Sequence, residues 1–340
     1  MVTGPILAIE TSCDETAAAV VEGREIRSNV IASQADLHTP YGGVVPEVAA
    51  RHHLGTVNAV VDEALSQARL TLSDISAVAV TQRPGLIGAL LVGVATAKAL
   101  AYAAEVPLIL VDHIHGHIAA TWLSPFALDP PFVSLVASGG HTRLALVRDY
   151  RTPELLGETR DDAAGEAVDK GARLLGLGYP GGAALERLGA GGDRAAFAFP
   201  IGLSGQDQVD FSFAGVKTAL LYKIRDLGID ETERQRADLA ASYQEAVMRP
   251  LAERLIRAAI REGVSAVALG GGVAANGRLR VLVAELAAQH DLRVVVPDSR
   301  LCTDNAAMIG AAAQFSDPTP WPDFLSLDAM PTMAPGGIAA

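Results

Sequence analysis

The fold of this chain is decided by a segment that occurs twice, as I-L-A-I-E-T-S-C-D-E-T-A-A-A-V-V (residues 6–21) and, diverged, as F-V-S-L-V-A-S-G-G-H-T-R-L-A-L-V (residues 132–147). Each copy has an apolar run, a polar turn and a second apolar run. This pattern is typical of a strand, a hairpin turn and another strand. The repeat predicts a chain built from two related halves.

Later elements repeat in the same order. The segment S-A-V-A-V-T-Q-R-P-G (residues 76–85) matches S-A-V-A-L-G-G-G-V (residues 265–273), and each reads as a strand that enters a glycine turn and a helix. Two further strands end at Asp112 and Asp298. Because strands alternate with helices, the sequence predicts α/β layers.

The spacing of these matches gives the domain organisation. The hairpins are offset by 126 to 128 residues and the later strands by 189, so the second half carries roughly 60 extra residues. We predict an N-terminal lobe over residues 1–130 and a C-terminal lobe over 131–316, with an inserted substrate-binding segment at about 150–215. Residues 317–340, rich in proline, glycine and methionine, are expected to form a partly ordered tail.

Composition excludes several classes of protein. Half of the 340 residues are hydrophobic and 19% are charged, which suits a large packed core. A net charge of −12 argues against a protein that coats nucleic acid through its overall field. Two cysteines fit a reducing compartment. The first ten residues lack a basic start and their apolar run stops at Glu10, so we expect no signal or transit peptide. The most apolar segment, residues 86–97, ends at Lys98 and is too short for a membrane span. We therefore expect a cytoplasmic protein.

Three histidines close an apolar stretch that reads as a buried strand. If a helix begins directly after this strand, His113 and His117 stand four residues apart on one face, and His115 points elsewhere. Two imidazoles in this arrangement are half of a metal site. The simple alternative is that these histidines are surface or capping groups.

The duplication suggests the missing acidic ligand. The segment that corresponds to residues 113–117 in the second half is S-R-L-C-T-D (residues 299–304). Ligands of open α/β sheets gather beyond the carboxyl ends of strands. If the two halves face each other across a cleft, Asp304 joins His113 and His117 there. Two imidazoles and a carboxylate leave coordination positions open, and both iron(II) and zinc suit them.

Three glycine-bearing or polar turns form a second set of candidates. They are residues 11–16 and 138–142, each between two strands, and residues 270–276, which precede a helix. Small residues let backbone N–H groups point at an anion, and a helix N-terminus favours a phosphate. Together they suggest a nucleotide held between the lobes, although polar hairpin turns often have no such role.

Nine motifs carry a family resemblance from residue 6 to about residue 310. The chain resembles the tRNA adenosine threonylcarbamoyltransferase family (TsaD in bacteria) in motifs that follow the family's order: I-E-T-S-C-D-E-T-A, P-E-V-A-A-R-H-H, H-I-H-G-H, S-G-G-H-T, A-G-E-A-V-D-K, Y-P-G-G, D-F-S-F-A-G-V-K-T, G-G-G-V-A-A-N and C-T-D-N-A-A-M-I-G. The resemblance implies two duplicated ribonuclease-H-like lobes of the actin, sugar-kinase and Hsp70 type with a central cleft. It also implies a metal-dependent acyltransferase that moves the threonylcarbamoyl group of threonylcarbamoyl-AMP to N6 of the tRNA adenosine just 3′ of the anticodon, releasing AMP.

The resemblance also assigns residues. It places the metal on His113, His117 and Asp304, with Fe(II) favoured over Zn(II), and the substrate on Val136, Ala137, Ser138, Gly139, Gly140, Asp169, Gly182 and Asn276. Glu186 is a further candidate that only some family members would use. His141 is a possible donor to the developing oxyanion, and a turn-stabilising role is its alternative. The implied partners are tRNA, a paralogous non-catalytic subunit (TsaB) and an ATPase (TsaE).

Rival functions stay open at this point. A phosphotransferase of the same fold would use paired phosphate loops but would not need the two histidines and the aspartate. A metalloprotease needs a glutamate inside the histidine motif, where this chain has Ile114. A third class is a non-catalytic scaffold that only recruits a partner.

Two arginine features are unassigned by the resemblance. Arg254, Arg257 and Arg261 recur at helical spacing and could form a local RNA-binding stripe or only a solvated face. Arg83 stands in T-Q-R-P-G-L where the family usually has glycine, so we assign that loop no ligand.

Overall fold

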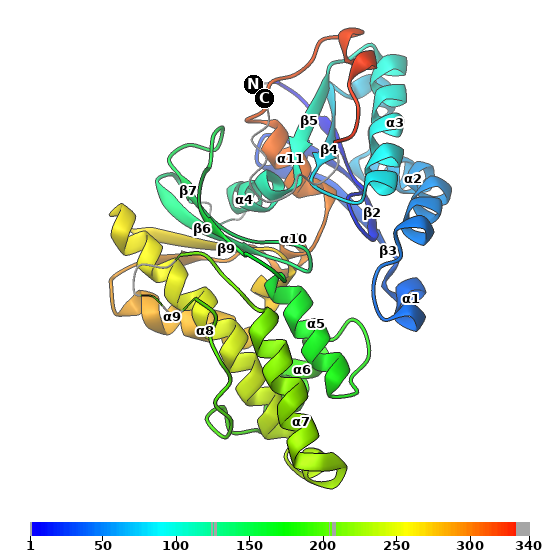
Figure 1. The fold of residues 1–340 in the computed structure, drawn as a ribbon. Coiled ribbons are helices and arrows are strands. Elements are labelled where there is room, and N and C mark those ends of the chain that lie inside the picture. The colour runs from blue at the N-terminus through cyan, green and yellow to red at the C-terminus, as the bar shows by residue number, and fades with distance from the viewer. Residues whose placement is uncertain (1, 124, 126–127, 204, 206–208, 331–340) are drawn as a thin grey trace. The chain divides into compact units, whose positions relative to one another are not determined.

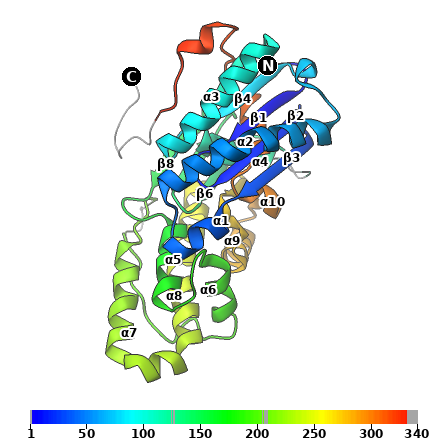
Figure 2. The ribbon, with the colours of Figure 1, turned by 90° about the vertical axis from the view of Figure 1, so that its right-hand side faces the viewer.

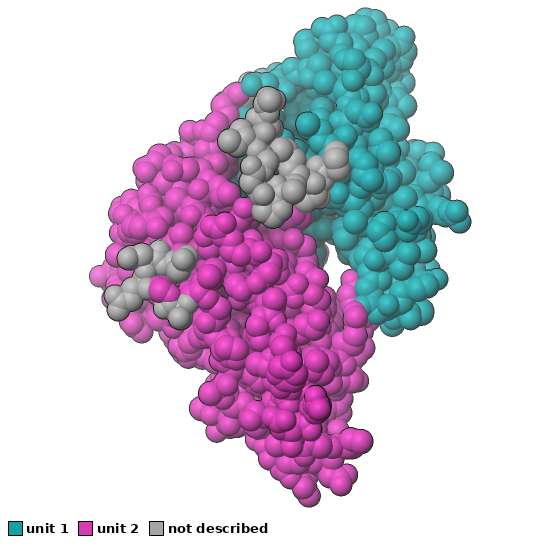
Figure 3. All heavy atoms as spheres, in the orientation of Figure 1, with its two compact units in different colours: residues 1–127, 303–340 teal, residues 128–302 magenta. Residues whose placement is uncertain are grey.

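The computed structural model describes residues 2–123, 125, 128–203, 205 and 209–330. The chain divides into two compact units, which Figure 3 colours separately. Unit 1 comprises residues 1–127 and 303–340, and unit 2 comprises residues 128–302. Residues 303–316, expected in the second lobe, therefore belong with the first 127 residues.

Unit 1 is built on a five-stranded sheet with the order β3-β2-β1-β4-β5 (Figure 1). The strands are β1 (Ile6–Glu10), β2 (Glu15–Glu22), β3 (Glu25–Ser33), β4 (Ala77–Arg83) and β5 (Leu108–Asp112). The first three pair antiparallel, and β1, β4 and β5 are parallel. The antiparallel hairpin of β1 and β2 is the predicted strand-turn-strand segment.

Helices cover both faces of this sheet. Side chains alternate along a strand, so Leu7 and Ile9 of β1 pack against helices α2 (Pro46–Ala68) and α3 (Ile87–Ala104), which run side by side in Figure 2. Ala8 faces the opposite way, where Gly310 of helix α11 (Ala306–Ala313) approaches it. Helix α4 (His113–Leu123) packs against α11 on that side.

Helix α3 is longer than the apolar segment of residues 86–97 predicted from the sequence. Among the described helices, it is the one whose length and composition would allow a membrane crossing, since its apolar run continues past Lys98 to Ala104. Core helices pass the same test, and α3 packs against α2 and β4. The Lys98 ammonium donates to the Leu327 carbonyl at 2.8 Å.

The described part of the predicted tail packs on unit 1. Backbone bonds join Thr319 to Leu108, and Met330 to Gln82, and Phe324 of the short helix η4 (Asp323–Ser326) is fully buried. Unit 1 also contains the short helices α1 (Ala35–His38), η1 (Thr39–Tyr41) and η2 (Leu72–Asp74). Residues 331–340 of the tail lie outside the described residues.

Unit 2 repeats the sheet of unit 1. Its order is β10-β9-β6-β7-β8, and the strands are β6 (Phe132–Ala137), β7 (Thr142–Val147), β8 (Glu154–Glu158), β9 (Ala266–Gly270) and β10 (Arg293–Val295). As in unit 1, three strands pair antiparallel and the two later ones are parallel to the first. The strand matches predicted from the sequence therefore correspond to equivalent positions in two sheets.

The units differ in what lies between their third strand and the long helix that follows. Unit 2 has helices α5 (Ala164–Leu174), α6 (Gly182–Gly189) and α7 (Ala214–Arg234) before α8 (Arg236–Glu262), whereas unit 1 has α1 and η1 before α2. Unit 2 ends with η3 (Gly272–Ala275), α9 (Gly277–Ala288) and α10 (Ser299–Cys302). Its core joins the sheet to α5, α8 and α9.

The proposed arginine stripe does not form on α8. Arg254 is only 4% exposed, its guanidinium donates to the carbonyls of Asp210, Gly202 and Leu203, and it stacks over Phe211. The spacing of the three arginines predicted that Arg254 is exposed to solvent. Its side chain is instead buried, because these carbonyls satisfy the hydrogen-bond donors of its guanidinium. Only Arg257 and Arg261 of the stripe line a surface groove of about 480 Å³ beside Glu253.

Candidate metal centre and substrate-binding segments

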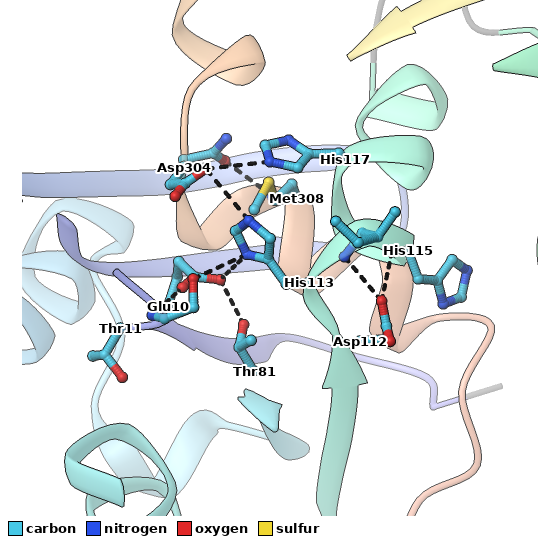
Figure 4. A network of polar contacts seen from close by, with 12 residues as sticks. Glu10, Thr11, Thr81, Asp112, His113, His115, His117, Asp304 and Met308 are labelled. Atoms are coloured by element: carbon cyan, nitrogen blue, oxygen red, sulfur yellow. Dashed lines mark hydrogen bonds and ion pairs between the residues drawn. The ribbon is translucent and has the colours of Figure 1, made fainter. Parts of the chain in front are cut away.

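The end of β5 sets the direction of the histidine side chains. Asp112 is its last residue, and its Oδ1 accepts the N–H groups of Ile114 at 2.9 Å and His115 at 3.2 Å. This carboxylate caps the first turn of α4, so the helix begins directly after the strand, as predicted. His113 and His117 therefore lie one turn apart, and Figure 4 shows His115 directed away from them.

Asp304 meets the two histidines within unit 1. Its Oδ1 lies 3.2 Å from Nε2 of His117 and 3.5 Å from Nε2 of His113. The three side chains can each present a ligand atom within 4.8 Å of the others (Figure 4). Both imidazoles are buried. The structure thus brings together the three residues that the sequence singled out as metal ligands.

Asp304 belongs to a different unit from the one predicted. We predicted that the second lobe supplies it, but residues 303–313 belong to unit 1 because α11 is buried along its whole length against the unit 1 sheet and α4. Asn305 caps α11 by accepting the N–H of Met308 at 3.0 Å. This cap holds Asp304 just before the helix, opposite the histidines.

For His113 and Asp304, neighbouring charged groups shift the pKa more than burial does. Burial lowers the pKa of His113, but the Asp304 and Glu10 carboxylates outweigh it and hold this pKa well above its usual range. Burial raises the pKa of Asp304, and the two imidazoles outweigh it and hold this pKa well below its usual range. His117 behaves differently, because burial dominates and lowers its pKa.

The cluster suits a divalent metal ion. In the described part of the chain, Nδ1 of buried His117 has no hydrogen-bond partner, and Nε2 has Asp304 Oδ1 at 3.2 Å but forms no well-aligned hydrogen bond with it, so metal ligation would satisfy Nε2. Donors bound about 2.1 Å from one ion lie about 3.0 Å apart in octahedral geometry and about 3.4 Å apart in tetrahedral geometry. The two nitrogen-to-Oδ1 distances, 3.2 and 3.5 Å, are close to these values.

Glu10 is a member of the cluster that the sequence analysis missed. It ends β1 and is completely buried, and its Oε2 lies 3.0 Å from Nδ1 of His113. In the sequence this acid reads as the start of the polar turn that follows the strand. A carboxylate at the end of a wholly apolar strand is the signal that could have identified it.

The residues that the resemblance predicts to bind substrate all belong to unit 2. Val136, Ala137, Ser138, Gly139 and Gly140 lie where β6 ends and the next turn begins. β6 pairs with β9, and a Cβ on Gly271 would lie 2.3 Å from the Ala137 carbonyl oxygen, so only glycine permits this approach. A Cβ on Gly165 of α5 would similarly meet the Ser138 carbonyl. Gly139 and Gly140 themselves are exposed, with open space beside each Cα.

A second group gathers at helix starts in unit 2. Asp169 of α5 accepts the N–H of Gly181 at 2.8 Å, which places it beside Gly182, the first residue of α6. Glu186 of α6 accepts the N–H of Gly277 at 2.8 Å and faces Asn276. Helix α6 connects the two contacts, since its N-terminus lies beside Asp169 and its Glu186 faces Asn276.

Asn276 has a structural task that was not predicted. The glycine turn leads into η3, and Asn276 caps the following helix α9 by accepting the N–H of Leu279 at 3.1 Å. His141 lies in the β6-β7 turn, where its N–H donates to the Ser138 hydroxyl at 3.2 Å and its carbonyl accepts the Ser138 N–H. Both contacts use the backbone of His141, so they test neither the turn-stabilising role of its imidazole nor a role as oxyanion donor.

Two threonine hydroxyls of the first hairpin turn contact other residues of unit 1. The Thr11 hydroxyl donates to the Ala89 carbonyl at 2.9 Å, and the Thr16 hydroxyl lies 2.8 Å from Nδ1 of His53. Two of the polar side chains suggested for phosphate binding in residues 11–16 are therefore engaged within unit 1.

Solved structures share the fold. The full-length HypF crystal structure in its phosphate- and nucleotide-bound form matches with a TM-score of 0.61 and 15% identity, over 92% of this chain and 46% of that chain. The activator of 2-hydroxyisocaproyl-CoA dehydratase from Clostridium difficile, with bound ADPNP, matches with a TM-score of 0.51 and 14% identity, over 91% of this chain and 94% of that one. At these identities the likeness concerns the fold.

Sequence relatives are much more similar. The chain is 52% identical to the tRNA N6-adenosine threonylcarbamoyltransferase of Clostridium perfringens, over 91% of this chain and 92% of the relative. Proteins of the same name from Cyanothece (54% identity, 91% of this chain and 90% of the relative) and Anaeromyxobacter (54%, 90% and 92%) are similar. The family profile described as TsaD, tRNA N6-adenosine threonylcarbamoyltransferase, matches residues 25–311. With that match over most of its length and relatives above 50% identity, the chain belongs to the tRNA N6-adenosine threonylcarbamoyltransferase family.

Proposed function

We propose that this chain transfers a threonylcarbamoyl group from threonylcarbamoyl-AMP to N6 of the tRNA adenosine just 3′ of the anticodon, with one divalent metal ion held by His113, His117 and Asp304. Membership of the threonylcarbamoyltransferase family supports the transfer to tRNA adenosine. The observation that carries the metal proposal is the cluster of two buried imidazoles and a carboxylate, in which neither nitrogen of His117 makes a well-aligned hydrogen bond within the described chain.

The reaction balances without a covalent intermediate on the protein. The N6 amine attacks the carbonyl carbon of the mixed anhydride and forms a C–N bond. The bond from that carbon to the phosphate oxygen breaks, AMP leaves with the electron pair, and N6 loses a proton. Because the acyl group arrives activated, the protein's task is to position the two substrates and to stabilise negative charge on the carbonyl oxygen.

We assign substrate binding to the predicted residues of unit 2 and activation of the threonylcarbamoyl group to the metal cluster of unit 1. Backbone N–H groups of Gly139 and Gly140 are suited to the phosphate, because glycine there leaves the backbone open to an anion, whereas the Ser138 N–H already donates to the His141 carbonyl. Asp169 and Gly182 would bind the nucleoside sugar, and Asn276 would bind the adenylate while it caps α9. A bound ion with open coordination positions would supply Lewis-acid polarisation of the threonylcarbamoyl group.

We expect Fe(II) in preference to Zn(II), because two histidines and one carboxylate on one side of an ion are typical of Fe(II) sites with open positions. We also expect the protein to act in the cytoplasm with a paralogous non-catalytic subunit and an ATPase. A separate enzyme would make the adenylate.

The test is reconstitution of the reaction. The purified chain, the two expected partners, synthetic threonylcarbamoyl-AMP and unmodified tRNA are incubated, and the digested tRNA is analysed by mass spectrometry. We expect the modified nucleoside with the wild-type chain and with His115→Ala, which alters the histidine that points away from the cluster. His113→Ala and Asp304→Ala should give folded proteins that form no product. Full activity in either variant would remove the metal from the reaction.

A further inference from the structure

We propose that Glu10 is a positioning residue for the metal: it holds the His113 ring so that Nδ1 carries the proton and Nε2 presents its lone pair to the ion. This inference rests on the proposed metal function of the cluster. It adds a residue from β1, outside the three ligands, to the machinery of the site.

The contacts of Glu10 fix its carboxylate in place. Oε2 lies 3.0 Å from Nδ1 of His113 and accepts the Thr81 hydroxyl at 2.6 Å. Oε1 accepts the backbone N–H of Ser12. These three donors come from α4, β4 and the turn after β1, and they compensate the cost of burying a carboxylate completely. Both oxygens are thereby held, and the carboxylate cannot turn away from the ring.

The chemistry of a carboxylate determines the tautomer of His113. An ionised carboxyl group only accepts hydrogen bonds, so the nitrogen that faces it must be the one that carries the proton. That nitrogen is Nδ1, and the opposite nitrogen, Nε2, faces Asp304 at 3.5 Å. A neutral ring in this tautomer has its lone pair on the side of the cluster. Metal-bound histidines are commonly oriented by such a carboxylate.

Glu10 does not take the place of a fourth ligand. Its Oε2 lies on the Nδ1 side of the His113 ring, whereas the ligand atoms gather on the Nε2 side. In the arrangement of Figure 4 the imidazole therefore stands between Glu10 and Asp304. His117 differs from His113, since its Nδ1 has no hydrogen-bond partner among the described residues. The orienting contact is specific to one of the two imidazoles.

A second polar group near Nδ1 provides a matched control. The Ser12 hydroxyl lies 3.2 Å from Nδ1, but it is neutral and can donate or accept. Ser12→Ala removes this hydroxyl and keeps the backbone N–H that binds Glu10. Glu10→Gln keeps the size of the side chain, removes its charge and places an amide among three donors.

The experiment measures metal affinity and the protonated nitrogen in the full chain. Zinc affinity is determined by competition with a chelator for the wild type, Glu10→Gln, Ser12→Ala and His113→Ala, and urea unfolding of each metal-free protein checks the fold. We expect Glu10→Gln to bind zinc 10- to 100-fold more weakly than the wild type, the range typical of such outer partners, and Ser12→Ala to change the affinity less than threefold. Wild-type affinity in folded Glu10→Gln would overturn the inference.

Nitrogen-15 spectra of the zinc-loaded wild type give a readout that needs no folded Glu10 variant. We expect His113 to carry a proton on Nδ1 and to bind zinc through Nε2. Zinc bound through Nδ1, or a proton on Nε2, would overturn the inference. If instead His113→Ala binds zinc as tightly as the wild type, the proposed metal site fails, and the role of Glu10 fails with it. The results for His113→Ala and Glu10→Gln therefore distinguish the two claims.

Discussion

Nε2 of His117 and Oδ1 of Asp304 lie 3.2 Å apart although α4 and α11 are separated in sequence by the whole of unit 2. The contact depends on the packing of the two helices, because Gly116 of α4 faces Met308 and Ile309 of α11 at a distance that leaves little room for a Cβ. The arrangement of the metal candidates thus follows from how α11 is seated on unit 1.

The packing of α11 against the unit 1 sheet should depend on Gly310. A Cβ at this position would lie 2.7 Å from Cγ2 of Val21 and 2.9 Å from its Cβ, and a β-branched residue within a strand cannot move away cheaply. We expect Gly310→Ala to lower the free energy of unfolding by about 1–3 kcal/mol and to weaken metal binding. Urea unfolding and chelator competition measure the two effects.

Gly55 is the matched control for this substitution. It lies in α2 with open space around its Cα. Gly55→Ala should therefore leave metal binding unchanged and raise the free energy of unfolding by up to about 1 kcal/mol, because alanine favours a helix more than glycine does. Equal effects of the two substitutions would show that α11 is not held where the structure has it.

Asp112 should contribute more to stability and to metal binding than Arg83, its ion-pair partner. Nε of Arg83 lies 3.5 Å from Asp112 Oδ2, and both side chains are about one-third exposed, so the pair contributes less than about 1 kcal/mol. Asp112 also caps α4 through the N–H groups of Ile114 and His115. We expect Asp112→Ala to cost about 0.5–2 kcal/mol and to weaken metal binding.

The comparison with Arg83→Ala isolates the cap. This variant breaks the ion pair and keeps the cap, so its metal affinity and its unfolding curve should stay close to those of the wild type. A larger effect of Arg83→Ala than of Asp112→Ala would contradict this account of the α4 N-terminus.

Glu15 should make the metal-free protein less stable as pH rises. Burial and the charges of Asp14 and Asp304 raise the pKa of Glu15 to about 9. The folded protein therefore keeps a proton that the unfolded chain, with a carboxyl pKa of about 4.3, releases. The free energy of unfolding falls between these two pH values, by up to about 1.4 kcal/mol per pH unit for one proton.

Unfolding in urea from pH 5 to pH 9 checks this dependence. Glu15→Gln should reduce the fall in stability, because it removes one of the protons that distinguish the two states; His113, whose pKa is also raised in the folded protein, keeps part of the fall above about pH 6.5. Glu25→Gln, which changes an exposed carboxyl on the same sheet, should keep the wild-type slope. A wild-type slope in Glu15→Gln would mean that the carboxyl is ionised in the folded protein.

Asp304 should be needed for its charge as well as its position. Asp304→Asn keeps the shape of the side chain and replaces the carboxylate that faces both imidazoles. We expect a loss of metal affinity larger than that of Glu10→Gln, since a ligand atom itself is changed. Chelator competition gives the ratio, and an unchanged affinity would exclude Asp304 from the ligand set.

The fold could be predicted from the sequence where local pattern decides it. The repeated strand-turn-strand segments and the glycine turns determine equivalent strands in two sheets, and the alternation of strands with helices determines the α/β class. The spacing of His113 and His117 was enough to predict one helical face once the strand before them was recognised.

The rest depends on packing over long sequence distances. Residues 306–313 are apolar on every side, so their sequence could not indicate which sheet they cover, and Asp304 was assigned to the wrong lobe. The spacing of Arg254 in the sequence predicted a solvent-exposed face, because the loop carbonyls that bind its guanidinium are distant in sequence. Glu10 was missed because its partners, Thr81 and His113, come from other strands and helices.

The central claim is that one ion binds His113, His117 and Asp304, and the most direct measurement is an anomalous difference map from crystals of metal-loaded protein, recorded at the absorption edge of the metal. We predict a single strong peak about 2.0–2.2 Å from Nε2 of both histidines and from a carboxylate oxygen of Asp304. A peak elsewhere, or none in protein that still modifies tRNA, would contradict the account.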